Sequence, residues 1–216
     1  MSDKKPILEI ESLSISFKEQ LLLKGISFSI NSNEIVAIVG ESGSGKSLTA
    51  LSVAGLLFQT PLSINSQKMQ LKGKELYNLS LKEWQSVRGQ DLGMVFQEPQ
   101  SSLNPSMRCG HQVMERLQKN KIGIPKERTN KVLEAFQQVQ LTNPDRIFKA
   151  YPHELSGGQK QRVMIAIALI GKPKLLIADE PTTALDVTVQ KEILTLIKDL
   201  QKASKMSVLF ISHDLS

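Results

Sequence analysis

The segment from Gly40 to Ser47 most narrowly limits what this chain can fold into. It reads Gly-Glu-Ser-Gly-Ser-Gly-Lys-Ser and matches the pattern G-x-x-x-x-G-K-[ST]. The apolar run Glu34–Val39 predicts a strand before it, and Ser47–Leu57 predicts a helix after it. Glycines in this setting let backbone N–H groups point toward an anion at the positive end of the helix. The segment therefore predicts a loop that holds the phosphates of a nucleoside triphosphate.

Individual roles follow from the chemistry of the loop residues. The Lys46 ammonium is expected to reach the β- and γ-phosphates, and the Ser47 hydroxyl is expected to coordinate Mg²⁺. The complete set of expected nucleotide contacts in the loop is Gly40, Glu41, Ser42, Gly43, Ser44, Gly45, Lys46, Ser47 and Leu48.

A second candidate site follows another apolar run. Leu175–Ala178 predicts a strand, and Asp179 and Glu180 come directly after it. In phosphate-loop proteins such an Asp holds the Mg²⁺ shell. A Glu in the next position can polarise a water molecule against the γ-phosphate. Lys46 and Asp179 are 133 residues apart, a longer interval than small nucleotide kinases and GTPases have, which indicates an insertion between the two sites.

Hydrophobic patterning predicts an α/β fold. The continuous runs Glu34–Val39, Leu175–Ala178 and Ser207–Ile211 are typical of parallel strands covered on both faces. A further strand is expected at Ile7–Ile10, and the alternating segments Leu13–Phe17 and Gly25–Ile30 predict an antiparallel, half-exposed sheet. Helices are expected at Ser47–Leu57, Gly110–Lys119, Lys126–Gln140, Gly158–Ile170 and Val187–Ala203. Helices thus dominate from Gly110 to Gly171, between two strands of the parallel sheet.

Composition restricts the class of protein. With 216 residues, 40% of them hydrophobic, the chain can bury the core of one domain with an insertion. One cysteine, Cys109, excludes an internal disulfide, argues against a cysteine-based zinc site and favours a reducing, cytoplasmic compartment. The longest uncharged stretch, Ser47–Gln67, is too polar to span a bilayer, and the N-terminal residues do not form a secretory signal. Any membrane role is therefore expected to depend on a partner.

The positive charge is concentrated in one segment. Nine Lys and Arg stand against four Asp and Glu between Leu103 and Ala150, a surplus of five in a chain whose formal charge is +6. Such a surface can face nucleic acid, lipid headgroups or an acidic protein. A solvated face of a helical segment explains it equally well, and base rates favour that interpretation.

Leu155-Ser156-Gly157-Gly158-Gln159, followed by Lys160-Gln161-Arg162, resembles the signature loop of ABC-type ATPases. Ser156 can cap the helix that follows, and the two glycines let bare N–H groups approach phosphate. The resemblance implies that Ser156, Gly157, Gly158 and Gln159 meet the ATP of a second subunit. Two chains then pack head to tail with two ATP molecules between them.

Other motifs extend the resemblance. Gln97 looks like the glutamine that touches Mg²⁺ and links to the membrane subunit, and Asp186, in Ala184-Leu185-Asp186, looks like a residue that contacts the facing subunit. His213 resembles the histidine that bonds the γ-phosphate, and it follows a parallel strand, where ligands of such sheets bind. Phe17, 23 residues before Gly40, aligns with the aromatic residue that stacks on adenine, although a core role suits it too.

The resemblance also implies a fold and a division of the chain. The fold is a P-loop NTPase with a RecA-like parallel sheet, an antiparallel β subdomain and an inserted ABC-type helical subdomain. Residues 1–100 and 172–216 are expected to form the core with the β subdomain, and residues 101–171 the helical part. The catalytic residues would be Lys46, Glu180 and His213, and the metal ligands Ser47, Gln97 and Asp179.

Three longer stretches resemble the ATP-binding subunits of oligopeptide, dipeptide and nickel importers: 96–105, 151–156 and 179–190. The implied function is ATP hydrolysis, with Mg²⁺, that drives solute import. The implied partners are a second such domain, permease subunits and, indirectly, a solute-binding protein; no nucleic acid is expected. The implied location is the cytoplasmic face of the cell membrane. A soluble ABC-type ATPase acting on nucleic acid or ribosomes, and an inactive nucleotide-binding remnant, are the alternatives.

Family members continue past the histidine that His213 resembles, so a truncated chain or the front of a tandem protein is expected. The absent part is expected to flank the strand Ser207–Ile211, and its absence to leave an unprotected, aggregation-prone sheet edge.

Overall fold

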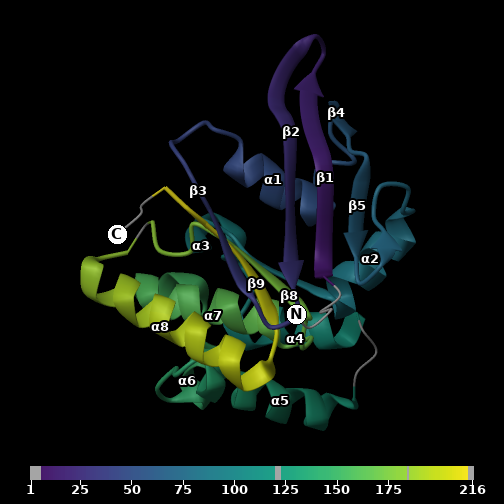
Figure 1. Ribbon diagram of the computed structural model, residues 1–216. Coiled ribbons are helices and arrows are strands. Elements are labelled where there is room, and N and C mark those ends of the chain that lie inside the picture. The colour runs from purple at the N-terminus through teal and green to yellow at the C-terminus, as the bar shows by residue number, and fades with distance from the viewer. Residues whose placement is uncertain (1–5, 120–122, 184, 214–216) are drawn as a thin grey trace.

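The computed structural model describes residues 6–119, 123–183 and 185–213, and Figure 1 shows it as a ribbon. The elements in chain order are β1 (Pro6–Phe17), β2 (Gln20–Asn31), β3 (Ile35–Val39), α1 (Lys46–Val53), β4 (Leu62–Asn65), β5 (Lys68–Leu71), β6 (Lys74–Glu75), α2 (Leu81–Gln90), β7 (Leu92–Val95), α3 (Pro99–Ser102), α4 (Cys109–Lys119), α5 (Pro125–Gln138), α6 (Pro144–Lys149), the 3-10 turn η1 (Pro152–Glu154), α7 (Gly157–Leu169), β8 (Leu175–Asp179), α8 (Val187–Ser204) and β9 (Ser207–Ser212).

The antiparallel sheet has the order β2-β1-β5-β6, with β4 also paired to β1. The sequence predicted two short strands where β1 is continuous from Pro6 to Phe17. The register of β1 against β2 shifts between Ile10 and Leu13, and Ser12 adopts a positive φ of 54° there. This irregularity breaks the alternation of apolar residues, which explains why one strand resembles two in the sequence.

The parallel sheet has the order β3-β9-β8-β7 and confirms the three parallel strands predicted from continuous apolar runs. The expectation that an absent part flanks the strand Ser207–Ile211 is wrong within this sheet, because β9 already lies between β3 and β8. The strands at the edges of the described sheet are β3 and β7, and Ile35 and Val39 of β3 are 45% and 37% exposed.

The strand β7 was not predicted, because four residues with a glycine at the second position give a weak pattern. The structure shows why the glycine is there. A Cβ at Gly93 would lie 2.5 Å from the backbone oxygen of Ala168 in α7. The glycine therefore lets α7 pack directly against β7.

Gly93→Ala is expected to lower the thermal midpoint of unfolding. The added methyl group must push α7 away from the sheet, and overpacking of this kind costs about 1–3 kcal/mol. In a chain of this size that corresponds to a drop in Tm of roughly 2–12 °C. Differential scanning calorimetry of the two proteins measures the effect, and an unchanged Tm would show that the contact between α7 and β7 is looser than described.

The five predicted helices all exist, with α1 shorter than expected. It ends at Val53 because Gly55 follows with φ of 68°, and a Cβ there would lie 2.3 Å from the Trp84 ring. The helices α2, α3 and α6 were missed. The first of them had a readable signal, because Ser80 and Glu83 form a capping box at its start.

The parallel sheet has a hydrophobic cluster on each face, because successive strand residues point to opposite sides. Leu176 packs in the cluster that contains α4, α5, α7 and α8, whereas Leu175 and Ile177 pack in the cluster with α1 and the antiparallel sheet. In Figure 1 the hairpin of β1 and β2 stands at the top, and α5 and α6 lie at the bottom.

The helical segment α3–α7 lies in sequence between β7 and β8, which are neighbours in the sheet. The predicted insertion of helices between two parallel strands is therefore confirmed. Within the described ranges, no helix combines the length and apolar composition that crossing a lipid bilayer requires.

Candidate functional site

Four parallel strands deliver the predicted site residues to one edge of the sheet. Gly40 directly follows β3 and Asp179 is the last residue of β8, while Gln97 and His213 follow the ends of β7 and β9. Because the carboxyl ends of parallel strands share one edge, these residues meet although they are distant in sequence.

The loop Gly40–Ser47 turns through two glycines with positive φ, Gly43 at 82° and Gly45 at 93°. Gly45 is also the N-cap of α1, so the loop ends at the positive end of that helix. The Lys46 side chain is only 6% exposed and curls back into the loop. Its Nζ donates hydrogen bonds to the backbone oxygens of Gly40 and Glu41, each at 2.7 Å.

Ser47 and Asp179 form the candidate metal site. The Ser47 hydroxyl donates to Asp179 Oδ1 at 3.1 Å, which joins α1 to the end of β8. Asp179 is 5% exposed, and this burial is the main cause that raises its pKa above the ordinary value. The Ser47 hydrogen bond and the Lys46 charge act in the opposite direction, whereas the neighbouring Glu180 carboxylate adds to the rise.

These donors fit a magnesium ion. Mg²⁺ prefers hard oxygen ligands and commonly takes one or two carboxylates together with substrate phosphates. A hydroxyl and a buried carboxylate within hydrogen-bond distance, beside a phosphate loop, supply that chemistry. The described contact of the third predicted ligand, Gln97, is with Glu180 and not with this pair.

Glu180 is the centre of a polar cluster. Its Oε2 accepts hydrogen bonds from Gln97 Nε2 at 3.0 Å and from Thr183 Oγ1 at 2.9 Å, and His213 Nδ1 lies 3.1 Å from the same oxygen. The side chain of Glu180 is 11% exposed and that of His213 is 52% exposed. Sequence reasoning missed Thr183; its position three residues after the acidic pair, within a turn that ends in the cap of α8, was the available signal.

A cavity of about 110 Å³ lies beside this cluster. The lining residues are Glu180, Thr182, Thr183, Gln190, Phe210, Ile211, Ser212 and His213. The carboxylate therefore borders a space that several water molecules can occupy.

The turn Ser156–Gln159 begins α7 as the sequence predicted. Ser156 Oγ accepts from the Gln159 backbone N–H at 3.3 Å, and Gln159 Oε1 accepts from the Ser156 N–H at 3.1 Å. Ser156 and Gly157 are exposed to solvent. Among the residues that the structure describes, no hydrogen bond or ion pair joins this turn to the loop Gly40–Ser47. The predicted contact of this turn with a second subunit stays a prediction.

Asp186 is exposed and caps α8, accepting from the Val189 backbone N–H at 3.0 Å. Ala184, which belongs to the motif that contains Asp186, lies outside the described residues.

Phe17 ends β1 and is 38% exposed, with the Lys18 ammonium 5.5 Å from the centre of its ring. A partly exposed ring leaves room for a stacked ligand, and its predicted contact with adenine remains untested.

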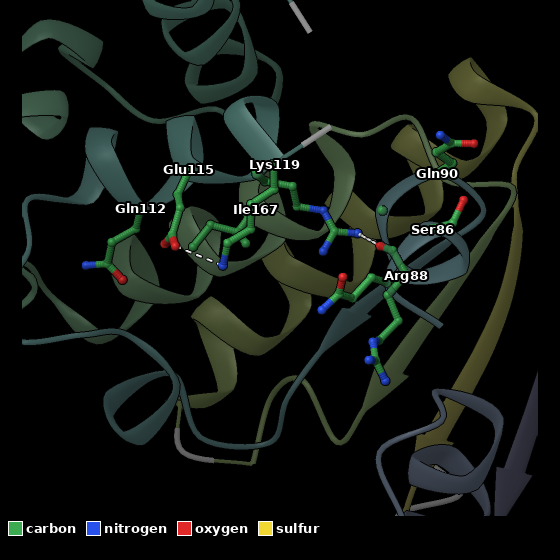
Figure 2. Close-up of a pocket in the computed structure, with 10 residues that line it drawn as sticks. Ser86, Arg88, Gln90, Gln112, Glu115, Lys119 and Ile167 are labelled. Atoms are coloured by element: carbon green, nitrogen blue, oxygen red, sulfur yellow. Dashed lines mark hydrogen bonds and ion pairs between the residues drawn. The ribbon is translucent and has the colours of Figure 1, made fainter. Parts of the chain in front are cut away.

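A larger groove of about 720 Å³ lies between α2, α4 and α7 (Figure 2). Arg116 crosses it and donates from one guanidinium nitrogen to the backbone oxygens of Arg88 and Leu92. Lys119 pairs with Glu115 at 2.8 Å on the same helix, α4. The lining contains three cationic side chains and one carboxylate, so the groove has a surplus of positive charge.

Comparisons with known proteins agree with this geometry. The family model described as ABC transporter matches residues 23–183, about three quarters of the chain. The oligopeptide transport ATP-binding protein OppD of Bacillus subtilis is 48% identical over 97% of this chain and 60% of its own length. The dipeptide transport ATP-binding protein DppD of Escherichia coli is 41% identical over 97% of this chain and 65% of its own.

The glutathione import ATP-binding protein GsiA of Escherichia coli is 44% identical over 99% of this chain and 36% of its own length. The chain thus spans between 36% and 65% of the length of these relatives.

Solved structures show the same fold. The dimeric structure of MJ0796, a bacterial ABC transporter cassette, superposes with a TM-score of 0.84 at 29% identity over 96% of this chain and 88% of that one. The structure of cbiO1 from Clostridium perfringens gives a TM-score of 0.80 at 29% identity over 97% of this chain and 79% of that one. The chain therefore has the P-loop NTPase fold of ATP-binding cassettes, and it belongs to the ABC transporter family.

Proposed function

We propose that the chain binds ATP and hydrolyses it to power solute import of the peptide class through a membrane permease. The observation that carries this proposal is the convergence of a phosphate loop, a hydroxyl–carboxylate pair and the Glu180 cluster at one edge of the parallel sheet. The names of the relatives, which are oligopeptide, dipeptide and glutathione import proteins, support the class of cargo.

Each residue takes a role that its position supports. The loop backbone from Gly40 to Gly45 and the Lys46 ammonium bind the phosphates, with Leu48 close behind in α1. Ser47 and Asp179 would hold Mg²⁺, which would neutralise phosphate charge. Glu180 accepts the proton of the attacking water as the bond to the γ-phosphorus forms and the bond to the β-phosphate oxygen breaks.

Gln97 and His213 act around the same carboxylate. Both contact Glu180 Oε2, and this shared contact supports their assignment to the γ-phosphate end of the site. Gln97 thereby connects the site to the helical segment, because α3 follows it directly. His213 holds the γ-phosphate, and Phe17 stacks on adenine at the far end of the nucleotide.

The second half of each ATP site comes from another chain. This half is assigned to Ser156, Gly157, Gly158, Gln159 and Asp186. In the part of the chain that the structure describes, the exposed turn and the exposed cap of α8 make no hydrogen bond or ion pair with their own phosphate loop. The solved structure of MJ0796 is that of a dimeric cassette, which supports a pair of cassettes; the pair proposed here is arranged head to tail. Binding of two ATP molecules closes the pair, and hydrolysis reopens it.

Residues 1–100 and 172–216 form the catalytic core with its β subdomain, and residues 101–171 form the helical subdomain. The position of α3–α7 in the sequence, between the neighbouring strands β7 and β8, supports this division. The chain works on the cytoplasmic face of the membrane, bound to permease subunits. The surplus of positive charge in the groove between α2, α4 and α7 favours a partner with complementary negative charge there.

A mixing experiment tests the two-chain site. At protein concentrations where few chains are paired, the rate of phosphate release from Mg-ATP is expected to rise with the square of the protein concentration. Glu180→Gln and Ser156→Arg chains are each expected to have almost no activity alone, since each change spoils both sites of a like pair, while Lys46 of every chain still binds ATP. Mixed together, they form pairs with one intact site and are expected to recover up to about a quarter of wild-type turnover, as statistical pairing with one active site per mixed pair dictates.

Recovery on mixing is the result that a single-chain site cannot produce. Release that is linear in protein concentration, together with an active Ser156→Arg chain, would contradict the proposal.

A further inference from the structure

The turn that follows β8 holds Glu180 in an uncommon backbone conformation. Glu180 has φ of 44°, in the left-handed region that non-glycine residues seldom adopt. Residues in such conformations persist where surrounding contacts hold them, and they cluster at functional sites. The contacts that hold this turn therefore also decide where the carboxylate points.

Thr183 donates two hydrogen bonds to Glu180, and both close the turn. Its backbone N–H donates to the Glu180 backbone oxygen at 3.3 Å, and its hydroxyl donates to Glu180 Oε2 at 2.9 Å. The Glu180 N–H is in turn bonded to the Ile211 oxygen of β9 at 3.1 Å. The backbone and the side chain of Glu180 are therefore both held by hydrogen bonds, and Thr183 donates two of them.

The three donors around the carboxylate come from three different places. Gln97 follows β7, His213 follows β9, and Thr183 belongs to the turn that leads into α8. All three meet the same oxygen, Oε2, and the hydrogen bonds found within the described ranges leave Oε1 without a donor. The hydrogen bonds to Oε2 fix the plane of the carboxylate. Oε1 keeps its lone pairs available to accept a proton, as a general base must.

The turn is itself anchored to α8. Gln190 Nε2 donates to the backbone oxygens of Thr182 and Leu185, at 3.1 and 3.0 Å. These bonds hold the segment on both sides of Thr183 against the first turns of the helix. A displacement of α8 or of its cap is therefore passed to Thr183, and through its hydroxyl to Glu180.

We infer that Thr183 is a positioning residue, which sets the orientation of the Glu180 carboxylate through its hydroxyl, with Gln190 as its anchor on α8. This inference rests on the proposed function, because the orientation matters only if Glu180 acts as a base. Thr183 itself touches neither substrate nor metal in this role. The turn of Thr183 lies in sequence between the base, Glu180, and the exposed cap, Asp186. It therefore links contact of Asp186 with the facing chain to the orientation of the Glu180 carboxylate.

The test compares Thr183→Val, which keeps the shape and removes the hydroxyl, with Thr183→Ser, which keeps the hydroxyl. Steady-state phosphate release is expected to show about a tenfold lower kcat for Thr183→Val with KM for ATP unchanged, since a hydrogen bond to a charged group is lost without any change in ground-state binding. Thr183→Ser is expected to stay within about twofold of wild type, and Gln190→Leu is expected to lower kcat in the same way as Thr183→Val. Thr195→Val is the matched control, because the hydroxyl of the exposed Thr195 donates to the backbone oxygen of Lys191 within α8.

Hydrogen exchange of the same proteins gives a reading that does not need turnover. The backbone amides of Glu180, Thr182 and Thr183 are expected to exchange about tenfold faster in Thr183→Val than in wild type or Thr183→Ser, because the turn loses one of the two hydrogen bonds that Thr183 donates. Unchanged kcat and unchanged exchange in Thr183→Val, or a loss that Ser does not rescue, would overturn the inference. A wild-type chain that releases no phosphate from Mg-ATP would refute the proposed function instead, while the exchange measurement still decides whether Thr183 holds the turn.

Discussion

Glu180→Gln is expected to lower the rate of ATP hydrolysis by about 10²–10⁴-fold, the usual contribution of a positioned general base. The amide keeps the size of the side chain and can still contact Thr183, but it cannot take a proton from water. ATP binding is expected to persist, because Lys46, Ser47 and Asp179 are unchanged. The variant should therefore accumulate as an ATP-bound pair, since closure is no longer followed by hydrolysis.

Single-turnover phosphate release and size-exclusion chromatography with Mg-ATP measure these two effects. Glu98→Gln is the control, because Glu98 is an exposed carboxylate one residue beyond Gln97 and contacts Ser101 rather than the cluster. Normal hydrolysis by Glu180→Gln would show that another group acts as the base.

Lys46→Ala is expected to weaken ATP binding by roughly 2–5 kcal/mol, the usual cost of removing one partner of a buried, hydrogen-bonded charge pair. Lys46 is 6% exposed and its ammonium already lies inside the loop, held by the oxygens of Gly40 and Glu41. Phosphate oxygens compete for the same donor, so little rearrangement is needed when nucleotide binds. The affinity should thus fall by a factor of about 30 to several thousand.

Isothermal titration calorimetry with Mg-ATP measures that loss, and the thermal midpoint of the ligand-free protein shows whether the loop still folds. Lys24→Ala, at an exposed position in β2, is the matched control. An unchanged affinity in Lys46→Ala would place the nucleotide elsewhere on the chain.

Local patterns allowed much of the site to be predicted. The glycines and lysine of 40–47 and the acidic pair after an apolar run each depend on a short segment whose backbone geometry its own residues largely determine. Ser156 illustrates the same point, because its capping box with Gln159 involves only four consecutive residues. Contacts between distant segments, such as Ser47 with Asp179, could be expected only as a consequence of parallel strands ending at one edge.

The elements that sequence reasoning missed depend on their neighbours. β7 is a four-residue strand whose glycine is required by α7, and α1 stops early because the Trp84 ring occupies the space beside Gly55. The position of β9 inside the sheet also depends on pairing partners more than 170 residues away. Neither the order of strands in a sheet nor a close approach of two backbones changes the hydrophobic periodicity of the sequence, so neither can be predicted from it.

The sequence by itself determined the phosphate loop, the acidic turn and the cap of α7, because the backbone conformation of each follows from adjacent residues. Only the tertiary structure decided that Gln97, Thr183 and His213 meet on one oxygen of Glu180, because that meeting depends on the order and register of three parallel strands and on the strained turn after β8. Hydrogen bonds between side chains act over about 3 Å, so which donors reach a carboxylate is decided by how strands pack rather than by how residues are spaced along the chain.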